Sequence, residues 1–257
     1  MTIQIERDAR EVATVTLNRP EVHNALDADT MDALSEFAAD PRCRVAVLTG
    51  AGASFCAGGD LGWMQAQFDA DEEERRREAR RLAGMLRALN EMPVPLIGRI
   101  NGQAYGGGVG MMAVCDIAIA AADAMFGLTE TRLGLIPATI GPYVIARLGE
   151  GPARRVFMSA KRFDAAEAVD LGLAARAVAS GDLDSAVEGE VSPYLACAPG
   201  AVRDAKRLAR RLGPPIGDAE IAASVDALMA RWRDPEAAEG VGAFFGKRKP
   251  VWADSRE

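Results

Sequence analysis

PLIGRINGQAYGGGVGMMAVCDIAIAAADAMFGLTETRLGLIP, residues 95–137, is the stretch that decides the fold of this chain. It opens with an apolar run over 96–100 that predicts a strand, and it turns at Asn101-Gly102. Three glycines follow at 106–108, and then an apolar segment over 109–114 that predicts a buried helix. A glycine run that leads into a helix leaves backbone N–H groups free to meet an anion.

The second half of the stretch leads to a single carboxylate. An alternating segment over 116–120 predicts another strand, and 124–127 predicts a further short extended piece. Glu130 follows among apolar residues. A lone carboxylate in apolar surroundings can be tuned for proton transfer. The stretch therefore predicts an anion-binding turn beside an acid or base.

The flanking segments predict an α/β fold. A short strand, a glycine turn and a helix occur in that order twice, over 44–92 and over 96–130, as in a sheet that is covered by its connecting helices. The glycine-dense segment 50–64 is expected to be a turn-rich loop. Strands are also expected over 3–7 and 11–17. Helices are expected from residue 26 and over 69–91, 142–147, 153–159, 165–170, 183–198, 200–212, 217–232 and 236–247.

The expected organisation is a core over residues 1–197, which contains the site, followed by a helical region over 198–257. The helix expected over 69–91 carries a dense run of charged residues, and this run is expected to be a solvated face. Its apolar stripe faces the core in this reading.

The composition excludes several classes of protein. The chain has 257 residues, 49% of them hydrophobic and 26% charged, which is typical of a soluble globular enzyme. A net charge of −7 argues against nucleic acid as the main partner, because binding there depends on Lys and Arg that neutralise phosphates. No segment reaches the roughly 20 apolar residues of a membrane helix. No signal segment precedes the first strand, so a cytoplasmic protein without a membrane partner is expected.

Histidine and cysteine usage limits the chemistry. The only histidine is His23, so catalysis or metal binding that needs several histidines is excluded. The four cysteines have no CxxC or zinc-type spacing and are expected to be reduced thiols. We therefore expect no metal and no redox cofactor, and we expect carboxylates and backbone amides to perform any catalysis.

Five segments together resemble the crotonase (enoyl-CoA hydratase/isomerase) superfamily, in family order and over nearly the whole chain. They are LNRPEVHNAL (17–26), RVAVLTGAGASFCAGGDL (44–61), INGQAYGGGVGMMAVCDIAIAAADAMFGLTETRLGLIP (100–137), AAEAVDLGLAARAV (165–178) and GVGAFFGKRKPVW (240–252). The resemblance implies a spiral of ββα turns followed by C-terminal helices that build a homotrimer or a dimer of trimers. It also implies an acyl-CoA thioester as substrate, with no cofactor beyond the CoA that the substrate carries.

The family's site residues are carried over by motif. The resemblance implies an oxyanion hole made by the backbone N–H groups of Gly59 and Gly107. Such donors are each worth roughly 3 kcal/mol in related sites. The resemblance also implies that Glu130, in FGLTE, is the catalytic acid or base. The predicted substrate-binding residues are Ala57, Gly59, Asp60, Leu61, Gly107 and Lys247, the last of them toward the CoA phosphates.

One position departs from the family. Hydratases of the family typically carry a second glutamate in a GGGxE pattern, and this chain has Gly110 there. One glutamate can still add water in a syn addition. It can equally move a double bond between the β,γ and α,β positions, as an isomerase does. A third alternative is a weakly catalytic protein that binds acyl-CoA. The sequence leaves these readings open, with hydration as the leading one.

The acyl group is a further prediction. The segment 135–168, the Asp60–Met64 segment and Gly110 resemble a branch that contains methylglutaconyl-CoA and carboxygeranoyl-CoA hydratases. The substrates of that branch carry a second carboxylate, so an arginine is expected to meet it. Four candidates follow from the sequence: Arg132, Arg147, Arg154 and Arg155.

Overall fold

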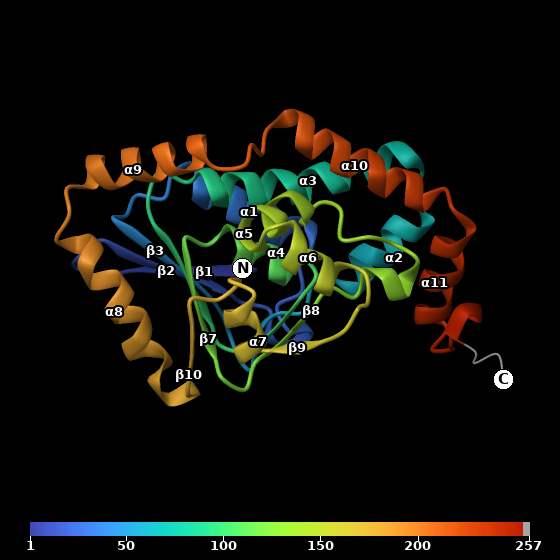
Figure 1. The fold of residues 1–257 in the computed structure, drawn as a ribbon, viewed down its shortest axis with the longest axis horizontal. Coiled ribbons are helices and arrows are strands. Elements are labelled where there is room, and N and C mark those ends of the chain that lie inside the picture. Colours follow the sequence, from blue (N-terminus) through green and yellow to red (C-terminus); the bar gives the residue numbers. More distant parts are fainter. Residues whose placement is uncertain (254–257) are drawn as a thin grey trace.

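A computed structural model of the chain describes residues 1–253 and contains two β-sheets (Figure 1). The larger sheet has the strand order β1-β2-β3-β5-β7-β10 and the smaller one the order β4-β6-β8-β9. The larger sheet consists of β1 (Ile3–Arg7), β2 (Val12–Leu17), β3 (Val45–Gly50), β5 (Leu96–Ile100), β7 (Ile117–Ala121) and β10 (Arg176–Val178). The smaller one consists of β4 (Ser54–Cys56), β6 (Gln103–Tyr105), β8 (Met125–Gly127) and β9 (Phe163–Asp164).

The two sheets grow together as the chain spirals. Each of three successive turns adds one strand to the larger sheet and the next strand to the smaller sheet, as β3–β4, β5–β6 and β7–β8. The strands that these turns add to each sheet pair in parallel, whereas β1–β2 and β8–β9 pair antiparallel. All six residues of β3 are buried, as expected for a central parallel strand that is covered on both faces. The predicted α/β spiral of ββα turns is confirmed.

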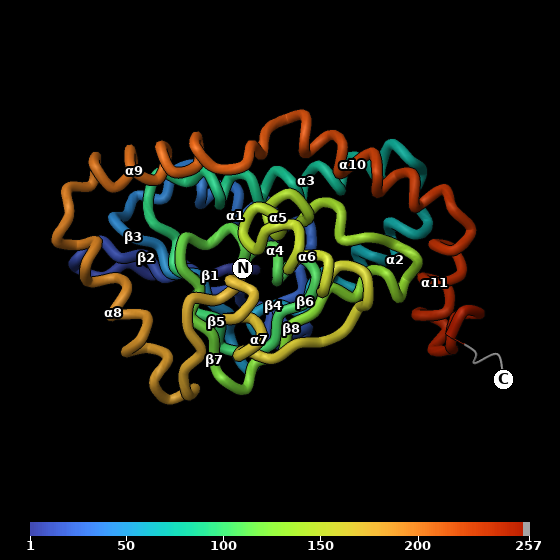
Figure 2. The backbone as a smooth tube through the Cα atoms, viewed as in Figure 1, coloured from blue at the N-terminus to red at the C-terminus, as the bar shows by residue number. Residues whose placement is uncertain are grey.

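Eleven helices cover the sheets in the described part of the chain. They are α1 (Ala28–Ala39), α2 (Leu61–Asp69), α3 (Glu72–Glu91), α4 (Gly107–Val114), α5 (Gly141–Leu148), α6 (Glu150–Phe157), α7 (Ala165–Asp170), α8 (Leu183–Leu195), α9 (Pro199–Leu212), α10 (Asp218–Trp232) and α11 (Pro235–Phe245). In the backbone view, α9 and α10 run along one side of the molecule over α3, and α11 turns toward α2 (Figure 2).

The structure corrects the expectation for residues 50–64. This segment is not only a loop: it contains β4 and the start of α2. Asp60 caps α2, because its carboxylate accepts hydrogen bonds from the N–H groups of Gly62 and Trp63. A second omission is β6 at 103–105, and α4 begins at Gly107, two residues before the predicted start. Three-residue strands among glycines carry too little alternation to be recognised from sequence.

The C-terminal helices cover one end of the core. The expected boundary between residues 197 and 198 falls between α8 and α9. From α10, Val225 and Met229 pack with Ala79 of α3, and from α11, Ala237 and Val241 pack with Leu135. These contacts bring α10 and α11 over the segment that follows Glu130, so the C-terminal helices help to enclose the site.

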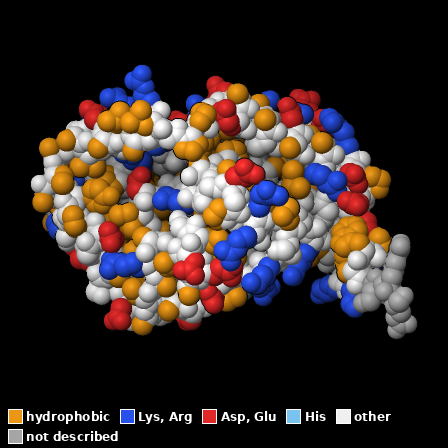
Figure 3. Space-filling model, in the orientation of Figure 1, with side chains coloured by type: hydrophobic (Ala, Val, Ile, Leu, Met, Phe, Trp, Pro, Cys, Tyr) orange, Lys and Arg blue, Asp and Glu red, His pale blue; other side chains and the backbone are white. Residues whose placement is uncertain are grey.

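Charged side chains are dispersed over the surface. Figure 3 shows acidic and basic groups interspersed on the face viewed, together with hydrophobic groups along α9. The exposed large hydrophobic residues include Leu208 and Leu212 of α9. Of the helices within residues 1–253, none combines the length and the apolar character that crossing a bilayer would require. Over the same residues, no three His, Cys, Asp or Glu side chains cluster as a metal site would need.

Candidate active site

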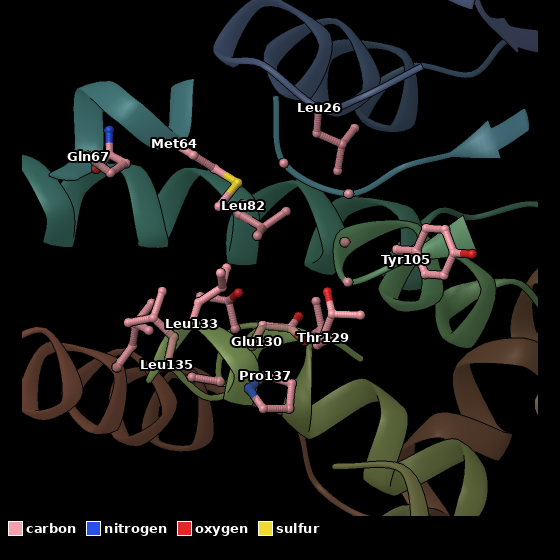
Figure 4. A pocket seen from close by; sticks show the side chains of 18 of the residues that line it. Leu26, Met64, Gln67, Leu82, Tyr105, Thr129, Glu130, Leu133, Leu135 and Pro137 are labelled. Atoms are coloured by element: carbon pink, nitrogen blue, oxygen red, sulfur yellow. The ribbon is translucent and has the colours of Figure 1, made fainter. Parts of the chain in front are cut away.

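A cavity of about 460 Å³ lies between the α2–α3 pair, the start of α4 and the segment that follows β8. Figure 4 shows its wall, with Leu26, Met64 and Leu82 on one side and Glu130, Leu133 and Leu135 on the other. Its volume is in the range of cavities that bind small molecules. Most of the lining is apolar, and the polar groups are few, as in sites where a small number of groups orient a ligand.

The backbone N–H of Gly59 points away from Leu26, the residue with which Gly59 pairs. Gly59 forms an isolated parallel bridge with Leu26. Leu26 donates its N–H to the Gly58 carbonyl at 2.7 Å. Within a trans peptide the N–H points opposite to the carbonyl, so the Gly59 N–H points away from Leu26. No acceptor for it is found among residues 1–253, and Gly59 lines the cavity.

Gly107 offers a second N–H donor. It is the first residue of α4, and the first bond of that helix runs from the Gly110 N–H to the Gly106 carbonyl at 3.0 Å. The N–H groups of the first turn therefore have no partner within the helix, and no side chain of residues 1–253 caps them. Partial positive charge at this helix end favours an anion. Gly107 also lines the cavity.

Two of the glycines are required by this geometry. Gly106 has a φ of +47°, a conformation that glycine adopts without strain. At Gly107 an added Cβ would lie 2.8 Å from Cδ1 of Leu26. Because neither position accepts a side chain without a shift, the turn holds the start of α4 close against the Gly59 loop.

The Glu130 carboxyl lies over this turn. Glu130 begins the short 3₁₀ helix Glu130–Leu133 that follows β8, and its Oε1 lies 3.0 Å from the position of a Cβ on Gly106. Its Oε2 is buried and has no hydrogen-bond partner among the described residues. Glu130 makes no ion pair within residues 1–253, and Arg154 pairs instead with Glu150 at 3.6 Å.

Burial changes the acidity of this group. Although Glu130 as a residue is only half-buried, its carboxyl faces the apolar cavity. This desolvation raises the pKa of Glu130 to about 7, and its own backbone N–H opposes the rise only in part. A carboxyl with such a pKa exchanges a proton readily near neutral pH.

The space beside Gly110 is occupied. An added Cβ there would lie 2.6 Å from Cγ2 of Ile140 and 3.4 Å from Cδ1 of Leu86. Ile140 is 2% exposed and lines the cavity. The wall at this point is therefore apolar, and within the described part of the chain Glu130 is the one carboxyl that lines the cavity.

The predicted substrate-binding residues divide into two groups. Ala57, Gly59, Leu61 and Gly107 line the cavity. Asp60 and Lys247 are not part of its lining. The Asp60 carboxylate caps α2 and pairs with Arg19 at 3.0 Å, and its pKa is lowered by these hydrogen bonds despite partial burial. Lys247 is exposed beyond the end of α11.

Of the four arginines predicted to meet a substrate carboxylate, only Arg132 lines the cavity. Arg147 donates to the carbonyls of Ala113 and Asp116 at 3.1 and 3.4 Å, and also to that of Cys115, where α4 ends. Arg154 and Arg155 are exposed and pair with glutamates on the surface.

Several lining residues were not predicted. Trp63, Met64 and Gln67 come from α2, which was concealed in the glycine-dense segment, and Arg75 comes from the charged run of α3. The available signal was Asp60, which lies three residues before Trp63 as a helix N-cap would. Arg75 and Arg162 are two cavity arginines that the motif comparison did not identify.

The fold and the cavity define a class of protein. In the described part of the chain, two unpartnered backbone N–H donors and one buried carboxyl line the same cavity, which is the arrangement of enzymes that stabilise an oxyanion while they move a proton. The chain belongs to the enoyl-CoA hydratase/isomerase family, whose model matches residues 7–255. The predicted membership of the crotonase superfamily is confirmed.

Individual relatives are similar over their full length. A crotonyl-CoA hydratase of Syntrophomonas wolfei is 32% identical, and the match covers 96% of each chain. A short-chain-enoyl-CoA hydratase of Clostridium acetobutylicum is 31% identical over 95% of each chain. Among solved structures, an enoyl-CoA hydratase of Mycobacterium smegmatis has a TM-score of 0.79 at 34% identity and covers 98% of this chain and 99% of its own.

Proposed function

We propose that the protein is an enoyl-CoA hydratase, which adds water to the α,β double bond of an acyl-CoA thioester. The observation that carries this proposal is the unpartnered Oε2 of Glu130 in the same cavity as the N–H groups of Gly59 and Gly107. The similarity to proteins named crotonyl-CoA and short-chain-enoyl-CoA hydratases supports it.

The proposed reaction uses Glu130 twice. The Glu130 carboxylate takes a proton from water while the water oxygen forms a bond to the β-carbon. The electron pair of the double bond moves to give an enolate, whose oxygen accepts hydrogen bonds from Gly59 and Gly107. The α-carbon then takes the proton back from Glu130, and the enolate returns to a thioester. Because Glu130 both activates the water and returns the proton, the hydroxyl and the proton reach the substrate from the same side in this proposal, and the addition is syn.

The acidity of Glu130 suits both steps. A pKa of about 7 leaves a substantial fraction ionised at neutral pH, and the protonated form is then acidic enough to protonate an enolate carbon. Two fixed donors typically stabilise an oxyanion by roughly 3 kcal/mol each. Because the donors belong to the backbone, they need no reorganisation during the reaction.

Isomerisation is the second candidate, and Ile140 is the observation that favours it. Because Ile140 fills the space beside Gly110, residue 110 brings no second group there, and Glu130 is the one carboxyl that lines the cavity among residues 1–253. One carboxylate is sufficient for an isomerase: Glu130 would take a proton from the α-carbon of a 3-enoyl thioester and return it to the γ-carbon. The apolar wall would exclude the water that hydration requires.

The acyl group and the assembly are finer proposals. We propose an acyl chain with a second polar oxygen, such as the carboxylate of a methylglutaconyl group, since cavity arginines such as Arg132 could meet it.

We also propose a homotrimer or a dimer of trimers, supported by the exposed Leu208 and Leu212 of α9. Analytical ultracentrifugation of the wild type and of Leu208→Gln/Leu212→Gln tests the assembly, and a monomeric wild type would contradict it.

The test of activity compares three substrates on one preparation of enzyme. Crotonyl-CoA, 3-methylglutaconyl-CoA and a 3-enoyl-CoA are incubated separately, and products are identified by chromatography and mass. Hydration of either of the first two supports the proposal. Isomerisation of the third without any hydration would replace it with the second candidate. Binding of thioesters without turnover would instead indicate a weakly catalytic acyl-CoA-binding protein.

A further inference from the structure

Gln67 carries a buried amide oxygen that no group in the described part of the chain satisfies. The residue is 7% exposed, and its Oε1 is buried without a hydrogen-bond partner among residues 1–253. Gln67 lies on α2 and lines the cavity. Buried side-chain acceptors are usually paired, because an unpaired one loses its hydration without compensation. Gln67 and Glu130 are the residues whose buried side-chain oxygens are unpaired in the described part of the chain, and they share one cavity.

Arg75 places an uncompensated cation in the same wall. Its Nε donates to the Gln67 carbonyl at 2.7 Å and its Nη2 to the Phe68 carbonyl at 2.8 Å, at the end of α2. The guanidinium also lies over the Trp232 ring, 4.8 Å from its centroid. No carboxylate pairs with Arg75 within residues 1–253. A guanidinium has five N–H donors, so several of its donors remain available.

The space between these groups and Glu130 is apolar. In Figure 4, Leu82 and Met64 lie between Glu130 and Gln67 along one side, and Leu133 and Leu135 lie opposite them. Leu135 and Val241 of α11 pack together at this end of the cavity. The cavity thus has a polar group at the reacting end, an apolar middle, and a second polar group at the far end.

We propose that Gln67 and Arg75 form a subsite that holds a polar oxygen on the far part of the acyl chain. A purely hydrocarbon chain would leave the Gln67 oxygen unpaired and would place methylene groups against the guanidinium. A hydroxyl oxygen accepts from Arg75 and can donate its hydrogen to the Gln67 oxygen. A carboxylate accepts from Arg75 and, after the amide of Gln67 turns over, from its N–H₂. The shared chemistry is an oxygen acceptor at the end of an apolar chain.

The subsite rests on the proposed function, because it treats the cavity as the place of an acyl-CoA chain. It adds the chemical character of that chain and names α2 as the element that selects it. Gln67 and Arg75 are specificity-determining residues in this proposal, since neither lies at the Glu130 end of the cavity where the double bond would react.

The test uses matched substrates that differ only at the chain end. Three 2-enoyl-CoA series of equal length end in a methyl, a hydroxyl or a carboxylate, and kcat/KM is measured for each at several lengths. The wild type is compared with Gln67→Met, which keeps the size and helical propensity but removes the polar group. The matched control is Gln65→Met on the same helix, because Gln65 pairs with Asp69 on the surface and is not part of the lining.

We expect the wild type to prefer a polar end over a methyl end by about tenfold at the fitting length, as one hydrogen bond provides. Gln67→Met should lower this ratio to a few-fold, because Arg75 alone then meets the oxygen, and Gln65→Met should leave it unchanged. The series with the larger gain in kcat/KM over the methyl series, hydroxyl or carboxylate, identifies the chemical group that supplies the oxygen. An unchanged ratio in Gln67→Met, or a wild-type preference for the methyl end, would overturn the subsite.

A second measurement separates the subsite from the reaction. Saturated acyl-CoAs with the same three chain ends cannot react, and calorimetry gives their Kd for the wild type, Gln67→Met and Arg75→Lys. If the wild type turns over no enoyl-CoA but binds the polar chains about tenfold more tightly, the proposed function fails and the subsite stands. If all three chains bind equally, the subsite fails whatever the reaction is.

Discussion

Ile140 occupies the space that a side chain at residue 110 would need. Its Cγ2 lies 2.6 Å from the position of a Cβ on Gly110, and its own Cβ lies 3.1 Å away. Real side-chain atoms do not approach so closely, so even an alanine at 110 would force a shift. The small residue at 110 and the branched residue at 140 therefore fit each other, and the apolar character of the cavity wall at Ile140 results from both.

This fit predicts a paired substitution. Gly110→Glu alone should destabilise the protein by about 2 kcal/mol through overpacking and should add no hydration activity. Gly110→Glu combined with Ile140→Gly should recover much of that stability, because the glutamate then has room. If a second carboxylate is what limits hydration, kcat for crotonyl-CoA should rise in the double variant above that of either single variant. Urea denaturation and initial rates measure the two effects.

The control for this pair is Ile140→Gly alone, which should cost stability by leaving a cavity. The double-variant cycle then gives the coupling between positions 110 and 140, which should be large and favourable. A Gly110→Glu protein as stable as the wild type would mean that Ile140 moves aside easily, and the argument from steric exclusion would then fail.

Glu130→Gln should reduce kcat by about 100- to 10,000-fold, since the amide cannot exchange the proton. Binding of a saturated acyl-CoA should change little, because the N–H groups of Gly59 and Gly107 remain.

In the wild type, kcat/KM should fall about tenfold per pH unit below pH 7, because the carboxylate must be ionised to accept the first proton. A profile flat from pH 5 to 8 would remove Glu130 from the role of base.

The same substitution should make the folded protein more stable at alkaline pH. The pKa of Glu130 is raised from 4.5 to about 7 in the folded state, so folding favours its protonated form. Its contribution to stability is fully present below pH 4.5 and is lost as the pH rises through 7. At pH 8, Glu130→Gln should therefore raise the free energy of unfolding by about 2 kcal/mol, and at pH 4 by much less.

Urea denaturation at the two pH values measures this difference. Glu150→Gln is the matched control, because the Glu150 side chain is 78% exposed and is not part of the cavity lining. A stabilisation of Glu130→Gln that is equal at pH 4 and pH 8 would indicate a packing effect rather than relief of a buried charge.

The resemblance carried by local motifs identified part of the cavity lining, and packing contacts determine the rest. The motifs imply Gly59, Gly107 and Glu130 as site residues, and the structure brings these three residues to one cavity. That Ile140 faces Gly110 could not be predicted, because the two residues are 30 positions apart and meet only through packing of α5 against α4. Such contacts have no local signature.

The charged run of α3 illustrates a second reason. It was expected to be a solvated face, and most of it is, but Glu78 within it is 4% exposed and Arg75 lines the cavity. Periodicity assigns charged residues to the outside of a helix. Periodicity carries no information on the helices that pack over that face, which here are α2 and the C-terminal helices. The start of α2 was itself expected to be a loop.

Trp63 should act as a positioning residue for Gly59. Its Nε1 donates to the buried Glu78 carboxylate at 2.7 Å, and its ring lies 3.4 Å from the position of a Cβ on Gly59. Trp63→Phe keeps a ring beside Gly59 but loses the bond that orients it. We expect kcat to fall about tenfold while KM changes little. The displaced Gly59 N–H would weaken the stabilisation of the oxyanion, which develops mainly in the transition state.

The control is Trp252→Phe, since Trp252 is 43% exposed and is not part of the cavity lining. Glu78→Gln should reproduce part of the effect, because an amide oxygen still accepts from the indole. A loss of stability in Trp63→Phe with unchanged kcat would show that the pair acts on folding alone and has no influence on the donor.

Arg147 should be structural rather than a ligand of substrate. Its guanidinium binds the carbonyls of Ala113, Cys115 and Asp116, so it satisfies the end of α4 opposite to Gly107. A cation at the C-terminal end of a helix is stabilised by the helix dipole. Arg147→Met should lower the free energy of unfolding by about 2 kcal/mol, because buried carbonyls lose charged donors. Arg147→Lys should recover part of this loss.

The decisive measurement is the ratio of KM for 3-methylglutaconyl-CoA to KM for crotonyl-CoA, which should be the same in Arg147→Lys and the wild type. A rise in that ratio without any loss of stability would indicate that Arg147 binds the substrate carboxylate. The carbonyls at the end of α4 would then need other hydrogen-bond donors.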